Sequence, residues 1–161
     1  MNSKEEMSAS SHFKEVLRKL NEHQVRYLIV GAYAVMKYTE PRYTKDLDIW
    51  VDPTPNNASR VFEALAEFGA PMNSVTVEDF ANPELVFQIG IEPHRIDIMM
   101  GIKGLGFSDA WPRRVEAGFE DVAINLISKE DLLIAKQAAG RPQDLIDADV
   151  LRLSQNLKAK S

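Results

Sequence analysis

The sequence predicts an α/β fold of the α+β type, in which a short, mixed, mainly antiparallel sheet of about five strands carries helices packed largely on one face. The strands are predicted by apolar and polar residues that alternate from Asp46 to Val51 and again from Arg95 to Met100. The helices are predicted by apolar residues that recur every three or four positions, as do Phe13, Val16, Leu17 and Leu20.

Length and charge are those of an ordinary globular chain. The 161 residues suit a single domain, which we expect over residues 11–157 after a flexible polar segment over residues 1–10. With 24 acidic against 19 basic residues the net charge is −5, and no Lys/Arg run stands out. This balance disfavours general electrostatic binding to a nucleic-acid backbone.

The residue types also restrict the compartment and the metal chemistry. The chain has no cysteine, which excludes disulfide bonds and thiolate metal ligands. It shows no signal peptide and no long apolar run, so we expect a cytoplasmic protein without a membrane anchor. The three histidines are scattered without the spacing of metal ligands and are expected to be ordinary surface or hydrogen-bonded residues: His12, His23 and His94.

A strand, a glycine and a helix follow the first helix, which we expect from about Ser11 to Asn21. Residues 26–30 form an apolar, β-prone run that stops at Gly31, and residues 32–38 suit a short helix that ends before Pro41. This order places unpaired backbone N–H groups and the positive end of a helix dipole at one point. Such a point can bind a phosphate group.

The next strand carries two aspartates on one face. Alternation over residues 46–51 puts Asp46, Asp48 and Trp50 opposite three apolar residues, with the Cα atoms of the two aspartates about 7 Å apart. Two carboxylates so placed repel each other, and either a proton or a divalent cation relieves the repulsion. The alternative is an acidic pair on a solvent-facing strand. Trp50 is expected in the core rather than as a platform for stacking a base.

The middle of the chain predicts a helix and then a hairpin. The helix is expected to have Thr54 as its N-cap, Pro55 as its first residue and Gly69 as its end. Residues 72–83 indicate a loop with a short strand at 75–77. Residues 85–91 and 95–100 are β-prone runs joined by a turn at Glu92, Pro93 and His94.

Asp97 repeats the arrangement of the earlier aspartates, because it lies opposite the apolar residues Ile96, Ile98 and Met100. If the two strands are neighbours, Asp97 joins Asp46 and Asp48 and completes a site of hard oxygen ligands for Mg²⁺ or Mn²⁺. The alternative is a single solvated aspartate on the rim of a hairpin.

The C-terminal part predicts a connector with a short helical turn over 101–112, a hairpin over 113–127 and two helices. Ser128 opens the first helix with a pattern like a capping box, and Gly140 ends it. Lys136 falls on the inward stripe of this helix, where a lysine needs a partner; the alternative is a lysine at the edge of the stripe that extends to solvent. The last helix begins at Pro142, with a local ion pair between Arg141 and Asp144 and an expected packing stripe of Ile146, Val150, Leu153 and Leu157.

Taken together, these residues resemble the polymerase-β-like nucleotidyltransferase superfamily, which combines a strand, a glycine turn, a helix, a D-x-D strand and a third aspartate on a later strand. The sequence from about Val25 to Leu153 is most similar to small bacterial AbiEii-type and uncharacterised nucleotidyltransferase-like proteins. One departure is Ala32, because the superfamily turn usually has glycine or serine in that place. The matching pieces here are Gly31, Pro41 to Thr44, Asp46 to Asp48 and Asp97.

The resemblance implies a metal-dependent enzyme that moves a nucleoside monophosphate from a nucleoside triphosphate such as ATP to a hydroxyl acceptor, namely an RNA end, a protein hydroxyl or a small molecule. Asp46, Asp48 and Asp97 would be the catalytic ligands of Mg²⁺ or Mn²⁺. The nucleotide-binding residues would be Gly31, Ala32, Arg42, Thr44, Lys45 and Lys136, with Thr44 orienting the D-x-D strand. The competing hypothesis is a non-catalytic nucleotide-binding or partner-binding module of a toxin–antitoxin or defence pair.

Overall fold

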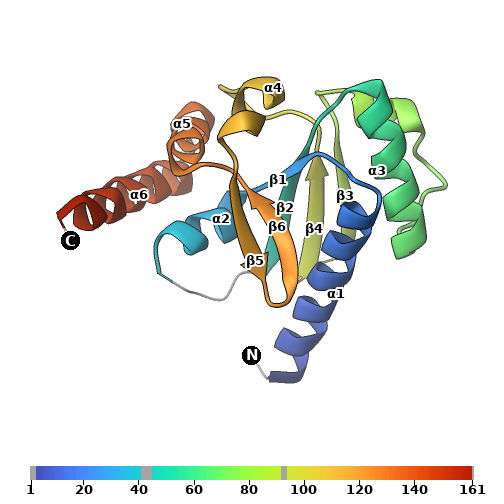
Figure 1. Ribbon diagram of the computed structural model, residues 1–161, viewed down its shortest axis with the longest axis horizontal. Coiled ribbons are helices and arrows are strands. Elements are labelled where there is room, and N and C mark those ends of the chain that lie inside the picture. Colours follow the sequence, from blue (N-terminus) through green and yellow to red (C-terminus); the bar gives the residue numbers. More distant parts are fainter. Residues whose placement is uncertain (1–2, 41–44, 92–93, 161) are drawn as a thin grey trace.

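The computed structural model describes residues 3–40, 45–91 and 94–160 and confirms a mixed sheet flanked by helices (Figure 1). The sheet has six strands, one more than expected, in the order β3-β4-β2-β1-β6-β5. Three neighbouring pairs are antiparallel, and the pairs β2–β4 and β1–β6 are parallel. The strands are β1 (Tyr27–Val30), β2 (Asp46–Val51), β3 (Val86–Ile91), β4 (His94–Met99), β5 (Val115–Phe119) and β6 (Val122–Leu126).

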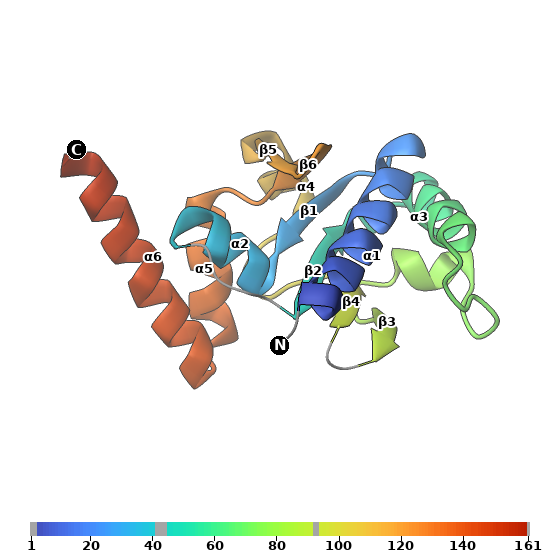
Figure 2. The same ribbon diagram turned by 90° about the horizontal axis from the view of Figure 1, so that it is seen from below.

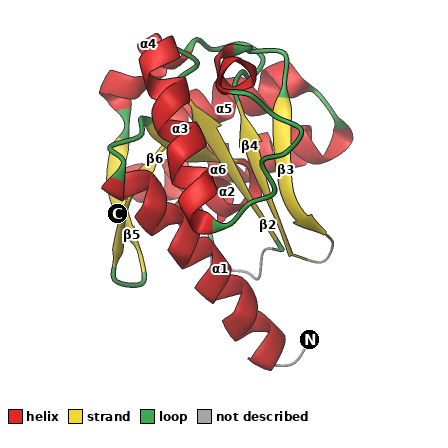
Figure 3. Cartoon of the chain, turned by 90° about the vertical axis from the view of Figure 1, so that its right-hand side faces the viewer, coloured by secondary structure: helices red, strands yellow, loops and turns green. Residues whose placement is uncertain are grey.

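The helices form two groups around this sheet. Helices α1 and α3 pack against each other over the sheet (Figures 1 and 3), whereas α5 and α6 pack against each other and contact α2 (Figure 2). In the described part of the chain, no helix is long and apolar enough to cross a membrane. The helices are α1 (Ser3–Glu22), α2 (Gly31–Tyr38), α3 (Pro55–Phe68), α4 (Phe107–Ala110), α5 (Lys129–Ala139) and α6 (Pro142–Lys160), with 3₁₀ turns at Val77–Ala81 and Trp111–Arg113.

Alternation along β2 sorts its side chains between the core and the site, as the sequence predicts. Leu47, Ile49 and Val51 are fully buried in the main apolar core. On the opposite face Trp50 is also buried, with its ring edge-on to that of Phe107 at a centroid distance of 5.1 Å. The prediction that Trp50 is a core residue is therefore confirmed. Only the other end of this face, at Asp46 and Asp48, remains for chemistry.

Two local predictions are wrong. Residues 75–77 do not form a strand, because Thr76 and Asp79 cap a 3₁₀ helix reciprocally: the Asp79 carboxylate accepts from the Thr76 backbone N–H at 2.9 Å. The first helix starts at Ser3, eight residues before the expected start at Ser11.

The expected packing stripe of α6 is also wrong. Ile146, Val150 and Leu153 are between 40% and 64% exposed, and the side chain of Leu157 lies outside the described residues. The buried face instead carries two aspartates and two apolar residues: Asp144, Asp147, Ala148 and Leu151. The physical reason is that α5 presents a buried cation to α6, so carboxylates rather than apolar side chains must face it.

Candidate active site

The turn between β1 and α2 brings the backbone against the carboxylate of Asp48. Val30, the last residue of β1, pairs with Asp48 on β2, and Gly31 follows with a φ of +71°. A Cβ atom built on Gly31 would lie 2.8 Å from Cγ of Asp48 and closer still to its Oδ2. Glycine at position 31 thus serves two needs, a left-handed backbone and room for the aspartate.

The three aspartates predicted to act together are brought together by the parallel pairing of β2 and β4. Asp48 pairs with Asp97, and Asp46 pairs with Arg95. Paired residues on neighbouring strands lie about 5 Å apart and point to the same face of the sheet. We refer to Asp46, Asp48 and Asp97 as the carboxylate cluster.

Arg95 is the cation that contacts this cluster directly. Its Nε lies 3.0 Å from Oδ1 of Asp97, and its Nη2 lies 3.9 Å from Oδ2 of Asp46. Arg95 was not a candidate in the sequence analysis. The signal was present, because a residue two positions before Asp97 on a strand must share its face.

The electrostatic environment of Asp48 is strongly perturbed. Burial, then the charge of Asp97, then that of Asp46 raise the pKa of Asp48 from 3.8 to about 6. Lys136 and Arg95 act in the opposite direction and lower it. Added positive charge near Asp48 would therefore be favourable.

The donor chemistry of the cluster fits a hard divalent cation. All of its ligand atoms are carboxylate oxygens, and Oδ1 of Asp46 is buried with no hydrogen-bond partner in the described chain. Across residues 3–40, 45–91 and 94–160, no three His, Cys, Asp or Glu side chains stand close enough to enclose a metal ion in this conformation.

A buried ionic network lies behind the cluster, between α5 and α6. Lys136 Nζ is 3.3 Å from Oδ1 of Asp144 and 3.1 Å from Oδ2 of Asp147, and both aspartates are buried. The expected partner of Lys136 is thus a pair of aspartates, and the lysine does not extend to solvent. Its charge still reaches the cluster, since it lowers the pKa of Asp48.

Arg141 forms the exposed end of this network. Its Nε donates to Oδ2 of Asp144 at 2.6 Å and its Nη2 to Oδ1 at 3.2 Å, which confirms the expected ion pair. The side chain is nevertheless 77% exposed. The hydrogen bond with Asp144 is the main cause of the raised pKa of Arg141, and the charge of Asp48 raises this pKa further. Arg141 is therefore an anchored, solvent-facing cation within electrostatic reach of Asp48, a role that the sequence analysis did not assign to it.

The other candidate residues lie around the same end of the sheet. Ala32 follows Gly31 in the first turn of α2, and Lys45 is exposed directly before Asp46. Arg42 and Thr44, with Pro41 and Tyr43, lie outside the described residues.

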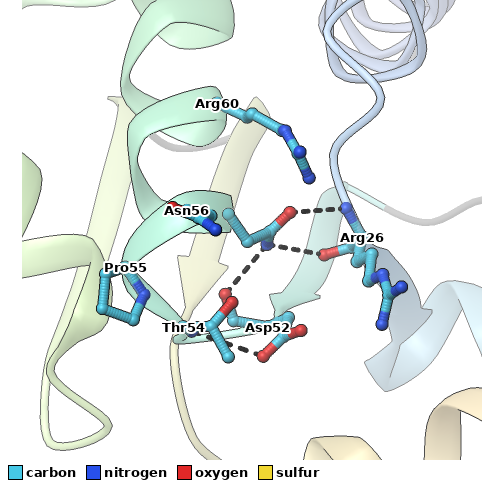
Figure 4. Close-up of a pocket in the computed structure, with 7 residues that line it drawn as sticks. Arg26, Asp52, Thr54, Pro55, Asn56 and Arg60 are labelled. Carbon is cyan, nitrogen blue, oxygen red and sulfur yellow. Dashed lines mark hydrogen bonds between the residues drawn. The ribbon is translucent and has the colours of Figure 1, made fainter.

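A pocket of about 480 Å³ lies away from this cluster, at the opposite end of β2 (Figure 4). Asn57 fixes its floor by accepting from the backbone N–H of Arg26 at 2.8 Å and donating to the carbonyls of Arg26 and Asp52. Since Asp52 follows the last residue of β2 and Asp46 is the first, this pocket is not part of the candidate site. Its lining is completed by Thr54, Pro55, Asn56 and Arg60.

Comparison with known proteins identifies a family. A family model described as a nucleotidyltransferase of unknown function (DUF6036) matches residues 8–160. No curated protein matches the sequence significantly.

Solved structures with a similar fold include three nucleotidyl-transfer or antibiotic-resistance proteins. The lincosamide antibiotic adenylyltransferase LnuA, solved with lincomycin bound, is 18% identical with a TM-score of 0.58, over 88% of this chain and 95% of that one. The antibiotic-resistance factor ANT(2'')-Ia is 14% identical with a TM-score of 0.57, over 96% and 86%. A putative nucleotidyltransferase from Thermotoga maritima is 17% identical with a TM-score of 0.54, over 97% and 96%. At these identities the likeness establishes the fold.

Proposed function

The chain belongs to the DUF6036 family of nucleotidyltransferases, and on this premise we propose that it transfers a nucleoside monophosphate from a nucleoside triphosphate to a hydroxyl acceptor with the help of Mg²⁺ or Mn²⁺. The observation that carries the proposal is the pairing of Asp48 with Asp97 on parallel strands, with Asp46 on the same face and the Gly31 turn beside them. Three carboxylates next to a backbone phosphate site are what metal-assisted phosphoryl chemistry needs.

Asp46 and Asp48 would hold the metal, and Asp97 would complete its coordination from the neighbouring strand. When bound, divalent ions neutralise charge on the phosphates and favour the ionised form of the attacking hydroxyl. Asp48 favours such a cation because its ionised form is disfavoured in the metal-free protein, where its pKa is about 6.

The triphosphate would lie over the turn at Gly31 and Ala32, where the first backbone N–H groups of α2 are free of helical partners. Lys45 and Arg141 are the exposed cations on the described part of the site that can contact its oxygens. Lys136 contributes from behind, by placing a buried positive charge near Asp48. Arg42 and Thr44 remain proposed contacts on sequence grounds.

For the acceptor we propose only a chemical class, namely a molecule with a hydroxyl group. An RNA end, a protein hydroxyl and a small molecule are all compatible with a hydroxyl acceptor. Two similar structures are described as an antibiotic adenylyltransferase and an antibiotic-resistance factor, which places small hydroxylated molecules first in a screen.

The test is transfer of label from α-labelled ATP, CTP, GTP or UTP to a panel of small molecules, to RNA and to a total cell extract, with and without Mg²⁺ or Mn²⁺. Thermal unfolding supplies a binding readout, since a ligand at 100 times its Kd adds about 2.7 kcal/mol. Asp48→Asn should abolish both responses to metal, whereas the matched control Asp52→Asn, at the other end of β2, should keep them. Equal metal responses in Asp48→Asn and the parent would count against the proposal.

Ala32 favours one competing function. In the turn that follows β1, an alanine supplies neither the flexibility of glycine nor the hydroxyl of serine for a triphosphate. The competing function is a non-catalytic nucleotide-binding or partner-binding module, as in a toxin–antitoxin or defence pair. Nucleotide-dependent stabilisation without transfer to any acceptor would support it. A kinship to AbiEii-type proteins is a separate proposal, which rests on the sequence resemblance over about Val25 to Leu153.

The proposal also includes the organisation of the chain. We propose one minimal catalytic domain over residues 11–157, and a cytoplasmic location in keeping with the absence of cysteine.

A further inference from the structure

Arg95 lies beside the carboxylate cluster and places a positive charge next to two of its aspartates. It is the pairing partner of Asp46 across the sheet and precedes Asp97 by two positions on its own strand. Its guanidinium therefore lies between two of the three aspartates, 3.0 Å from Oδ1 of Asp97 and 3.9 Å from Oδ2 of Asp46. The protein thus brings a cation of its own to the oxygens that are proposed to bind metal.

Arg95 contacts Asp97 more closely than it contacts Asp46. The guanidinium leaves Oδ1 of Asp46 buried and without a hydrogen bond in the described chain. The Arg95 side chain as a whole is 29% exposed, against 11% for that of Asp97, although its Nε is buried. A divalent cation carries twice the charge and can contact oxygens of all three aspartates.

We propose that Arg95 is a displaceable counterion of the metal site, which holds Asp46 and Asp97 in the metal-free protein and leaves them when a divalent cation binds. This inference rests on the proposed function, because it concerns the same carboxylates. It assigns to Arg95 a positioning role: the residue keeps the cluster from being an uncompensated group of negative charges, at the cost of weaker metal binding.

The inference predicts opposite effects of one substitution on two measured quantities. Arg95→Met keeps an apolar stem of similar length but removes the charge. Without metal its melting temperature should fall, because the cluster loses its counterion. The affinity for Mn²⁺ should rise by about tenfold or more, because the ion no longer has to displace Arg95 from Asp46 and Asp97 before it binds. Arg95→Lys, which keeps a cation, should stay close to the parent in both quantities.

The experiment is a Mn²⁺ titration of the metal-free chain without nucleotide, followed by electron paramagnetic resonance of free Mn²⁺, at about 0.15 M ionic strength to screen distant charges. Melting temperatures are measured in parallel with and without saturating Mn²⁺. Arg60→Met is the matched control, since this exposed arginine lines the pocket of Figure 4 at the other end of β2. Its affinity for Mn²⁺ should equal that of the parent.

Tighter Mn²⁺ binding in Arg95→Met alone, together with a lower metal-free melting temperature, supports the inference. If the parent binds Mn²⁺ and Arg95→Met binds it equally or more weakly, the inference is overturned while the proposed metal site stands. If neither the parent nor any Arg95 variant binds Mn²⁺, both the inference and the metal dependence of the proposed function are overturned. If Arg95→Met does not fold, Arg95→Gln replaces it with the same expected outcomes.

Discussion

The carboxylate of Asp48 occupies the space that a side chain on Gly31 would need. The two residues come from different elements, the D-x-D strand and the turn after β1, and the antiparallel pairing of Val30 with Asp48 brings them together. The phosphate-binding turn and the metal-binding carboxylate of the proposed site are therefore in direct contact. A substitution at Gly31 should therefore also affect the carboxylate of Asp48.

Gly31→Ala tests this contact. The new methyl group would overlap the Asp48 carboxylate, and the φ of +71° is strained for any residue with a Cβ. We expect the free energy of unfolding to fall by about 2 kcal/mol or more and the metal response to be lost with it. Gly118→Ala is the control, since Gly118 has no such φ and the nearest atom to its added Cβ would be at 3.6 Å. Urea denaturation of both variants distinguishes them, and equal stabilities would contradict the contact.

The pKa of Asp48 predicts a pH dependence with a definite sign. Because this pKa rises from 3.8 to about 6 on folding, the folded protein binds more protons than the unfolded chain between these values, so stability falls as pH rises through that window. Asp48→Asn does not titrate there. Without metal, we expect the free energy of unfolding of Asp48→Asn to exceed that of the parent by about 3 kcal/mol above pH 6 and to lose this advantage toward pH 4. Denaturant titrations across this range measure the difference, with Asp52→Asn following the parent.

The carboxylate cluster could be anticipated from the sequence because strand alternation is a local property. Once 46–51 and 95–100 are strands, Asp46, Asp48 and Asp97 must each lie on the face opposite the apolar residues. The pairing of Asp48 with Asp97 could not be read in this way, since the register of β2 and β4 is set by their packing in the whole sheet.

The α6 prediction was wrong for a related reason. Ile146, Val150 and Leu153 have helical spacing, and apolar spacing predicts a buried face only when the facing element is apolar. Here the facing element presents Lys136, and the need of that buried ammonium for carboxylates outweighs the pattern. The burial of Lys136 was predictable from its phase on α5, but its partners were not.

Lys136→Met probes the buried network. The substitution keeps the packing of α5 but leaves Asp144 and Asp147 buried without the ammonium between them. We expect the free energy of unfolding to fall by about 3 kcal/mol, the cost of leaving a buried charge without its partner. Adding Asp147→Asn should restore part of the loss, because it removes one of the two buried carboxylates that the ammonium of Lys136 pairs with. An additive double mutant would argue that the two residues are not coupled.

Arg141→Gln separates nucleotide binding from stability. The guanidinium is 77% exposed, so its loss should change the free energy of unfolding little, while Lys136 continues to pair with Asp144. If Arg141 contacts phosphate, the affinity for nucleoside triphosphate should fall by about tenfold, the scale of one charge-assisted hydrogen bond. The control is Arg152→Gln on the same helix, whose side chain pairs with Asp149. Calorimetric titration of both variants should show a loss only in Arg141→Gln.

The reaction itself is tested by comparing two aspartates of the cluster. Asp46 and Asp48 lie on the strand beside the Gly31 turn, whereas Asp97 comes from β4 on the far side of β2 from β1. If the triphosphate lies over Gly31, Asp97 approaches from the acceptor side, and its ionised carboxylate is needed most when the acceptor oxygen is activated. Interactions formed only at that stage appear in turnover and not in ground-state affinity. Asp97→Asn should therefore bind nucleotide and metal within a few-fold of the parent and yet lose transfer by roughly 10²-fold or more. Asp46→Asn should lose both binding and transfer. Paired calorimetric titration and single-turnover transfer to the acceptor found in the screen make the comparison, and a parental transfer rate in Asp97→Asn would rule out the metal-assisted mechanism proposed for these three aspartates.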